Sequence, residues 1–413
     1  MSETLTIDHL GAQGDGVAVT PSGPVYVPFA LPGEVVEAEV RKGRASRVKL
    51  QQAAPERAEP VCRHFADCGG CAVQHLEQEA YRAWKRDKVE RALQARGIDV
   101  AVEPLVACPP QTRRRVTFTA RRLGSDILLG FNAAQTHRIV VIEECPVATP
   151  VITGALDDLR DLAKAIAATP KPFHMTVTET VSGLDIAVVG AGKLGEKQRR
   201  AVVDMALSKQ VSRLSADGEI IVEGNKPAVL FGGVPVAIPP AGFLQATAEA
   251  ENAMAALVAG HLEGCKHVAD LFAGSGTFAL RLAQKARVYA AEGDAGALAA
   301  LDNAARQWPS LKPVKAEKRD LFHRPLLAKE LADFDGLVFD PPRAGAEFQC
   351  RQLARSTVRR IAAVSCNPGT LARDLAILVE GGYRVTSVTP IDQFLWSPHV
   401  EAVALLEKKP QRR

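Results

Sequence analysis

The stretch Val268–Leu280, VADLFAGSGTFAL, decides the fold of the carboxyl-terminal half of the chain. An apolar strand leads into a turn, where Gly274 and Gly276 let the backbone bend tightly beneath a ligand, and a helix starts directly afterwards. Glu292 ends the next apolar run, 22 residues after Asp270, at an offset where a carboxylate suits the hydroxyls of a ribose. The stretch therefore predicts a nucleotide-type cofactor site.

Apolar strands and helices alternate around this stretch from about residue 239 onward, which predicts βαβ units on a parallel sheet. The last two segments, 383–394 and 399–409, predict an antiparallel hairpin at its edge. A Rossmann dehydrogenase also has glycines and an acid, but Phe278 or Ala279 stands where its third glycine is needed. With Asp340-Pro341-Pro342-Arg343 at a strand end, the region resembles the class I S-adenosylmethionine-dependent methyltransferases. An α/β fold of this class is expected, and hydride transfer takes second place.

Three domains are predicted along the chain. Residues 1–52 form short alternating strands broken by turn residues, a pattern typical of a small β-barrel that closes on itself, as in OB-like folds. A polar, proline-containing linker follows. Residues 60–238 are rich in strands and form the predicted central domain, and 239–413 form the predicted methyltransferase domain.

Cys366 is the candidate nucleophile, because VSCNPGT places it at the carboxyl end of the apolar strand IAAVSC, where open α/β sheets bind ligands. A helix starting near Thr370 is expected to lower the pKa of its thiol. A buried, inert cysteine is the alternative, but the carboxylate of Glu401 in SPHVE favours catalysis. A thiol beside a methyl donor suits C5 methylation of a pyrimidine, since C5 becomes nucleophilic only after a thiolate adds at C6.

Three of the eight cysteines lie together in CRHFADCGGCAVQH, at Cys62, Cys68 and Cys71. Eight cysteines in 413 residues are too few for a disulfide scaffold, and a tight cluster indicates metal binding or catalysis. Four thiolates hold either zinc or a four-iron four-sulfur cluster, and the spacing does not choose between them.

Positive charge is concentrated between Arg82 and Arg122, with eleven Lys or Arg residues against four Asp or Glu, although the net charge of the chain is only +4. A solvated helix face is the ordinary interpretation of one such run. Two runs close together, carrying Trp84 and Phe118, favour a polyanion such as RNA.

The amino-terminal MSETLTIDHLGAQGDG has no basic segment followed by an apolar run, and no stretch of about 18 apolar residues occurs. A cytoplasmic protein without a membrane segment is therefore expected. Nothing in the sequence indicates an obligate protein partner, so a monomer is expected.

Six ordered motifs resemble the RNA uracil-C5 methyltransferases, particularly the iron–sulfur bacterial enzymes that make 5-methyluridine in ribosomal RNA. The motifs are CRHFADCGGCAVQH, GFLQATAEAEN, DLFAGSGTF, DPPR, SCNPGTLARD and PHVE. The resemblance implies that the first domain is a TRAM module, which binds RNA, and that Cys366 is the nucleophile and Glu401 removes the C5 proton. It also implies a 4Fe-4S cluster on the three clustered cysteines and Cys145, with zinc as the second choice of metal.

The resemblance further assigns a set of contacts to the methyl donor. They are Gln245, Phe272, Gly274, Thr277, Glu292, Asp320 and Asp340. Thr277 stands where many of these enzymes have asparagine. Around Gln245, only the glutamine itself matches the motif of the family. The family acts on ribosomal RNA in bacteria and on transfer RNA in some archaea, so both substrates stay open.

Three other functions are considered for this sequence. A non-catalytic RNA-binding protein would need a degraded site, whereas Cys366 and Glu401 are both present. An amino-group methyltransferase usually has an aromatic residue after the prolines, where Arg343 stands here. A cytosine-C5 enzyme would use the same thiol chemistry, and only the family resemblance argues against it.

Overall fold

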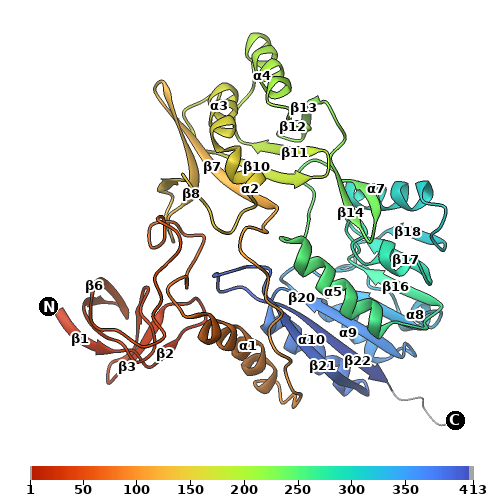
Figure 1. The fold of residues 1–413 in the computed structure, drawn as a ribbon. Coiled ribbons are helices and arrows are strands. Elements are labelled where there is room, and N and C mark those ends of the chain that lie inside the picture. The colour runs from red at the N-terminus through yellow and green to blue at the C-terminus, as the bar shows by residue number, and fades with distance from the viewer. Residues whose placement is uncertain (1, 409–413) are drawn as a thin grey trace.

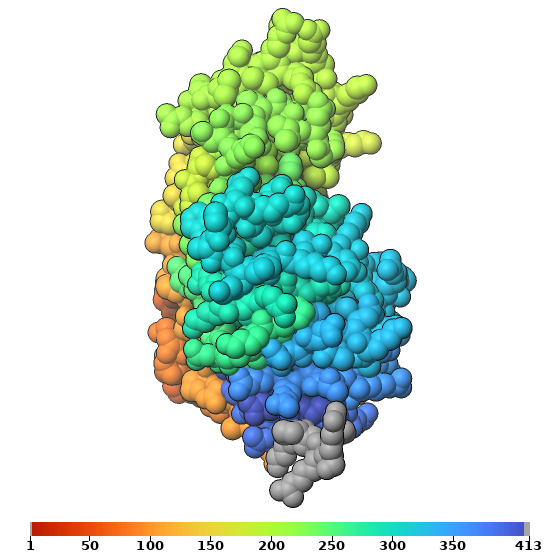
Figure 2. Space-filling model, turned by 90° about the vertical axis from the view of Figure 1, so that its right-hand side faces the viewer, coloured from red at the N-terminus to blue at the C-terminus, as the bar shows by residue number. Residues whose placement is uncertain are grey.

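A computed structural model describes residues 2–408, which form three sheets, a separate hairpin and ten helices (Figure 1). Residues 1 and 409–413, at the outer ends of the predicted first and third domains, lie outside the described residues. Figure 2 shows an elongated molecule, with residues around 190–230 at one end and the carboxyl-terminal strands toward the other. Within 2–408, no helix is long and apolar enough to cross a membrane.

The amino-terminal sheet is a curled half-barrel, not the closed barrel expected. Its strand order is β1-β5-β6-β4-β3-β2, so β1 and β2 are its edges. The sheet does not close, since the two residues of β2 pair with β3 and not with β1. Its core contains Leu5, Val27, Val36 and Ala38. The strands are β1 (Ser2–Thr6), β2 (His9–Leu10), β3 (Gly16–Thr20), β4 (Gly23–Val27), β5 (Val35–Arg41) and β6 (Arg44–Gln52).

The middle sheet has seven strands in the order β13-β12-β11-β10-β7-β8-β9. Apolar residues alternate along β10, and Phe173, Met175 and Val177 are buried with Leu159 and Leu162 of α3. The strands are β7 (Arg115–Leu123), β8 (Asp126–Asn132), β9 (Ile139–Val141), β10 (Phe173–Thr180), β11 (Gly183–Val189), β12 (Arg213–Ala216) and β13 (Glu219–Glu223). The helices are α2 (Pro150–Gly154), α3 (Leu156–Ile166) and α4 (Glu196–Ser208).

The carboxyl-terminal sheet has the order β18-β17-β16-β19-β20-β22-β21. Its strands are parallel except β22, which runs antiparallel to both neighbours, so the predicted edge hairpin is confirmed. The strands are β16 (His267–Leu271), β17 (Arg287–Glu292), β18 (Val314–Lys318), β19 (Gly336–Phe339), β20 (Arg360–Ser365), β21 (Tyr383–Ile391) and β22 (Glu401–Lys408). The helices are α5 (Ala248–His261), α6 (Ala279–Leu282), α7 (Ala295–Gln307), α8 (Ala328–Leu331), α9 (Glu347–Ala354) and α10 (Pro368–Glu380).

Both faces of this sheet are covered, because successive strand residues point to opposite sides. Val268 of β16 lies in one core with α5, α6 and α7, whereas its neighbour Ala269 lies in another with α8, α9 and α10. Strands that are buried on both faces have continuous apolar sequences, and the sequence of this region shows such runs. The strand order reverses between β16 and β19, which is where open α/β sheets bind ligands.

Two segments from the predicted central range pack against the carboxyl-terminal sheet. Helix α1 (Gln78–Gln94) shares a core with α10 through Val89 and Leu93. The hairpin of β14 (Ala228–Phe231) and β15 (Val234–Ala237) packs on α7. The predicted boundaries at 60–238 and 239–413 stay predictions. The contacts show that parts of the first stretch pack into the cores of the second.

Candidate active site

Four predicted site residues follow the ends of neighbouring parallel strands. Phe272 comes directly after β16, Glu292 ends β17, Asp340 follows β19, and Cys366 follows β20. Because parallel strands end at the same edge of the sheet, the structure brings these residues to one edge, beside the reversal of strand order.

The turn after β16 has an unusual backbone. Phe272, Gly274 and Gly276 have φ angles of 62°, 55° and 103°. The amide of Gly274 donates to Glu292 Oε2 over 2.9 Å, and the amide of Asp294 donates to Oε1 over 2.7 Å, so the carboxylate is fixed beside the turn. Space beyond Gly274 is open, since a Cβ there would meet no atom within 4 Å. Thr277 lies in the same turn, before the short helix α6.

Asp320 lies beside this turn, in the loop after β18. The ring of Phe322 packs on that of Phe272 with 5.4 Å between centroids. Asp320 Oδ1 accepts the amides of Phe322 and His323, and Oδ2 lies 2.8 Å from His323 Nδ1. The His323 side chain lowers the pKa of this carboxyl. An aromatic wall beside an exposed carboxylate suits a flat ring that carries an amino group.

Cys366 and Glu401 lie next to the ends of two neighbouring antiparallel strands. The register of β20 with β22 ends at the pair of Ser365 with Ala402, and Cys366 and Glu401 are the next residues along the two chain segments. Helix α10 begins at Pro368, and Asn367 caps it. The pKa of this thiol is nevertheless raised: burial and the nearby carboxylates of Glu401 and Asp340 raise the pKa of Cys366, and Arg343 opposes them.

Glu401 is a buried carboxylate with one unoccupied oxygen. Its side chain is 2 % exposed, and burial together with Asp340 raises its pKa well above the usual range. Oε2 accepts a hydrogen bond from Gln393 over 2.5 Å, whereas Oε1 has no partner among the residues described. A carboxylate of raised pKa with an unoccupied oxygen has the properties of a general base.

Gln245 joins Asp340 to the same cluster. Its Nε2 donates to Asp340 Oδ2 over 2.8 Å, and its Oε1 accepts from Gln393 over 2.9 Å. Burial raises the pKa of Asp340 to about 7, against the opposing effect of Gln245.

The sequence interpretation missed Gln393 and the pair formed by Arg343 and His399. Gln393 follows β21 by two residues, and Arg343 Nη2 lies 3.0 Å from His399 Nδ1. Burial and Arg343 lower the pKa of His399 to about 4. The only sequence signal for Arg343 was its place after Pro342, and Gln393 had none beyond lying in the hairpin loop.

Comparisons with known proteins bear on the whole chain. A family model described as tRNA (Uracil-5-)-methyltransferase matches residues 239–409. The chain is 60% identical, over the full length of both, to an uncharacterized RNA methyltransferase of Mesorhizobium japonicum. It is 31% identical to the 23S rRNA (uracil(1939)-C(5))-methyltransferase RlmD of Pectobacterium atrosepticum, covering 97% of this chain and 93% of that one. The chain belongs to the RNA uracil-C5 methyltransferases.

A solved structure agrees with this assignment. The tRNA (uracil-54, C5)-methyltransferase of Pyrococcus abyssi, in complex with S-adenosyl-L-homocysteine, superposes with a TM-score of 0.77 at 25% identity, over 98% of this chain and 99% of that one. The chain is therefore an S-adenosylmethionine-dependent enzyme that methylates C5 of uracil in RNA, on the class I methyltransferase fold. This assignment excludes a dehydrogenase, an amino-group methyltransferase and a non-catalytic RNA-binding protein.

In this RNA uracil-C5 methyltransferase, the four predicted metal cysteines line one cavity of about 430 Å³. Burial and, to a lesser extent, the other three thiols raise the pKa of Cys71 to about 12. Within 2–408, however, no three His, Cys, Asp or Glu side chains lie close enough to hold a metal ion. Four thiolates are suitable ligands for a metal, but the described side chains are not close enough together to coordinate one.

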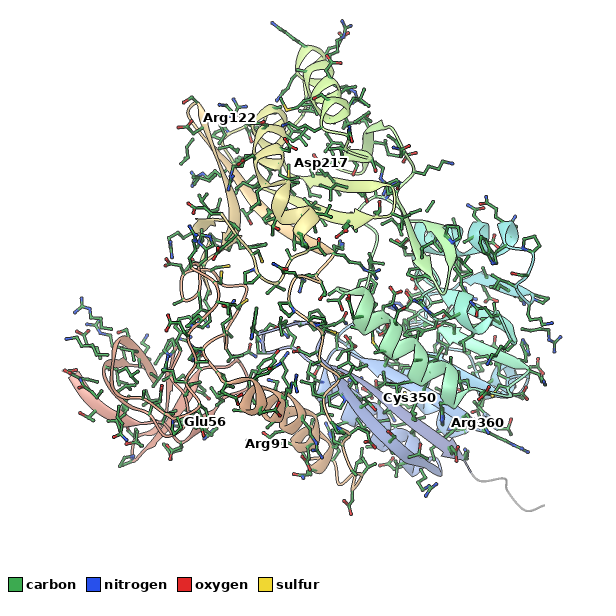
Figure 3. All side chains as sticks on the ribbon, viewed as in Figure 1. Glu56, Arg91, Arg122, Asp217, Cys350 and Arg360 are labelled. Atoms are coloured by element: carbon green, nitrogen blue, oxygen red, sulfur yellow. The ribbon has the colours of Figure 1, made fainter. Side chains whose placement is uncertain are left out.

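The predicted basic surface is only partly exposed. Lys85 is fully buried and paired with Asp392, and the aromatic residues Trp84 and Phe118 are buried in cores, so they do not offer rings to RNA. Figure 3 places Arg91 on α1 and Arg122 at the far end of β7, so the basic stretch is not one continuous patch. Two of its members, Arg113 and Arg115, line the cysteine cavity together with Arg343.

Proposed function

We propose that this enzyme methylates a uridine of ribosomal RNA through a covalent bond between Cys366 and C6 of the uracil. The position of Cys366 and Glu401 directly beyond the pair of Ser365 with Ala402 supports the proposal, because it brings the proposed nucleophile and the proposed base to the same edge of the sheet. Relatedness to the ribosomal enzyme over 97% of the chain supports ribosomal RNA as the substrate.

The reaction follows from the two side chains. S-adenosylmethionine, when bound, supplies a methyl group on a sulfonium sulfur. The Cys366 thiolate, favoured by Arg343, adds to C6 and makes C5 a nucleophile for that methyl group. Glu401 Oε1 then takes the C5 proton, the electrons of the C–H bond restore the C5–C6 double bond, and the bond from C6 to sulfur breaks.

The methyl donor is assigned to the turn after β16 and its neighbours. Glu292 suits the ribose hydroxyls, Phe272 and Asp320 suit the adenine ring and its amino group, and the open side of Gly274 leaves room for the donor. Gln245, Thr277 and Asp340 complete the proposed contacts.

The mechanism is tested by the order of its steps. Glu401→Gln, which keeps shape but removes basicity, should accumulate a methylated protein–RNA adduct that survives denaturation and depends on S-adenosylmethionine. Cys366→Ala and the double variant should form none. RNA with 5-fluorouridine at the target should trap the unmutated enzyme, because no base removes fluorine as a cation. Full methylation by Cys366→Ala, or normal turnover by Glu401→Gln, would overturn the mechanism.

The RNA itself is identified by mapping 5-methyluridine in ribosomal and transfer RNA from a deletion strain. Loss of the modification from ribosomal RNA alone is the expected result. Loss from transfer RNA alone would favour the second candidate, transfer RNA uridine, to which the archaeal structure is the relevant relative.

A 4Fe-4S cluster on Cys62, Cys68, Cys71 and Cys145 is part of the proposal. The support is that all four thiols line one cavity. Because methyl transfer needs no electron, the proposed role of the cluster is structural. It would link two chain segments that are distant in sequence, beside the RNA. The amino-terminal half-barrel is proposed as a TRAM-type RNA-binding module, and the enzyme is proposed to act as a monomer in the cytoplasm.

A further inference from the structure

Gln393 occupies the centre of the catalytic edge. It lies in the loop between β21 and β22 and is only 3 % exposed. The loop is anchored beside it, because Asp392 pairs with the fully buried Lys85 over 2.8 Å and accepts from Tyr81 Oη over 2.6 Å. The backbone of Gln393 is therefore fixed by contacts outside the reaction site.

The orientation of the Gln393 amide is set by a single backbone group. The N–H of Ala246 lies 2.9 Å from one end of the amide, and because an N–H only donates, that end is the oxygen. The other end is the nitrogen, which donates to Gln245 Oε1 and to Glu401 Oε2. Gln245 consequently turns its own nitrogen to Asp340.

We propose that Gln393 is a positioning residue that holds Glu401 by one carboxylate oxygen and leaves the other for the C5 proton. The inference rests on the proposed function, since it needs Glu401 to act as the base. Oε2 is occupied by Gln393, whereas Oε1 is buried with no partner among the described side chains and backbone groups. A donor on one oxygen thus selects which oxygen reacts and keeps the carboxylate from turning.

The same hydrogen bond favours the charged base. Glu401 is surrounded by Asp340, Cys366 and Arg343, of which Asp340 raises its pKa and Arg343 lowers it, and Gln393 adds to the lowering. Replacing Gln393 by methionine keeps the length and volume of the side chain but removes both donors. Glu401 then loses the hydrogen bond that fixes its carboxylate, and its pKa rises, so it stays protonated to a higher pH.

The test separates the steps of the reaction in Gln393→Met. Adduct resolution is followed with uridine RNA in single turnovers quenched in denaturant, and adduct formation with 5-fluorouridine RNA, which stops before the base acts. Loss of a hydrogen bond to a charged group predicts resolution slowed roughly 10- to 100-fold. Adduct formation and the dissociation constant of S-adenosylhomocysteine should stay within about twofold of the parent. The pH at which resolution is half-maximal should rise.

Gln349→Met is the matched control. Gln349 is also a buried glutamine, 1 % exposed, and among the described residues its amide bonds only the backbone of Leu326. Its loss should lower stability without slowing adduct resolution, which separates positioning from general loosening of the fold.

Each outcome decides between the two proposals. Resolution at the parental rate in Gln393→Met, or an equal loss of adduct formation and donor binding, overturns the positioning role while the covalent mechanism stands. Absence of any 5-fluorouridine adduct in the unmutated enzyme overturns the proposed function itself.

Discussion

Gly274 and Gly276 both need a positive φ, but only one of them has room for a side chain. A Cβ on Gly276 would lie 3.0 Å from Leu280 Cγ and 3.1 Å from Leu301 Cγ, whereas Gly274 opens onto free space. Gly276 is therefore required by packing, whereas the open space beside Gly274 is where the donor is proposed to lie.

Gly276→Ala should lower the free energy of unfolding by roughly 1–3 kcal/mol, from backbone strain plus crowding. Gly274→Asn should change it by less than about 1 kcal/mol, because asparagine tolerates this backbone region. Its side chain should nevertheless abolish donor binding. Urea unfolding and calorimetric titration with S-adenosylhomocysteine measure the two effects, and undiminished donor affinity in Gly274→Asn would move the donor elsewhere.

At the scale of elements, the loop between β21 and β22 joins three parts of the fold. Lys85 of α1 also donates to the backbone carbonyls of Phe394 and His399, and the amides of Ala72 and Val73 donate to Trp396 O. The segment that carries the clustered cysteines and the helix after it therefore pack directly on the loop that leads into Glu401.

Lys85→Met should cost roughly 3–5 kcal/mol of stability, because it leaves the Asp392 carboxylate buried without its partner. The double variant with Asp392→Asn should cost clearly less than the sum of the two single variants. Denaturant unfolding of the four proteins measures the coupling. Additive costs would mean that the two residues do not act as a pair.

At the scale of the whole molecule, Cys145 lies 74 residues beyond Cys71 but lines the same cavity. Anaerobically purified protein should be brown, because thiolate-to-iron charge transfer absorbs visible light. Cys145→Ser should lose iron and colour as fully as Cys68→Ser, while Cys265→Ser, outside the cavity, should keep both. Colourless protein with stoichiometric zinc, or a brown Cys145→Ser protein, would contradict the proposed cluster.

RNA binding should depend on the arginines of the cavity. Arg113 and Arg115 line it, whereas Arg200 lies on α4 and is 76% exposed. Replacing the first two by glutamine should weaken RNA binding and flatten its dependence on salt, because fewer counterions are released. Arg200→Gln should change neither. Filter binding at several salt concentrations measures the slopes, and equal slopes in all variants would exclude the cavity as the RNA contact.

The sequence by itself determined the class of the carboxyl-terminal fold, and it gave the predictions of the donor turn and of the pair Cys366 and Glu401. These features are local: apolar runs, glycines and the residues at strand ends report on their own surroundings. The prediction that Cys145 joins the three clustered cysteines came only through the resemblance to a family.

Only the tertiary structure decided how the site residues act on one another. Burial raises the pKa of Cys366 although a helix starts beside it, and Lys85, which read as part of a basic surface, is a buried partner of Asp392. The role of Gln393 depends on Ala246, 147 residues away, whose amide fixes its orientation. Burial and hydrogen-bond direction are properties of what surrounds a residue in space, and for these residues the surroundings come from distant parts of the chain.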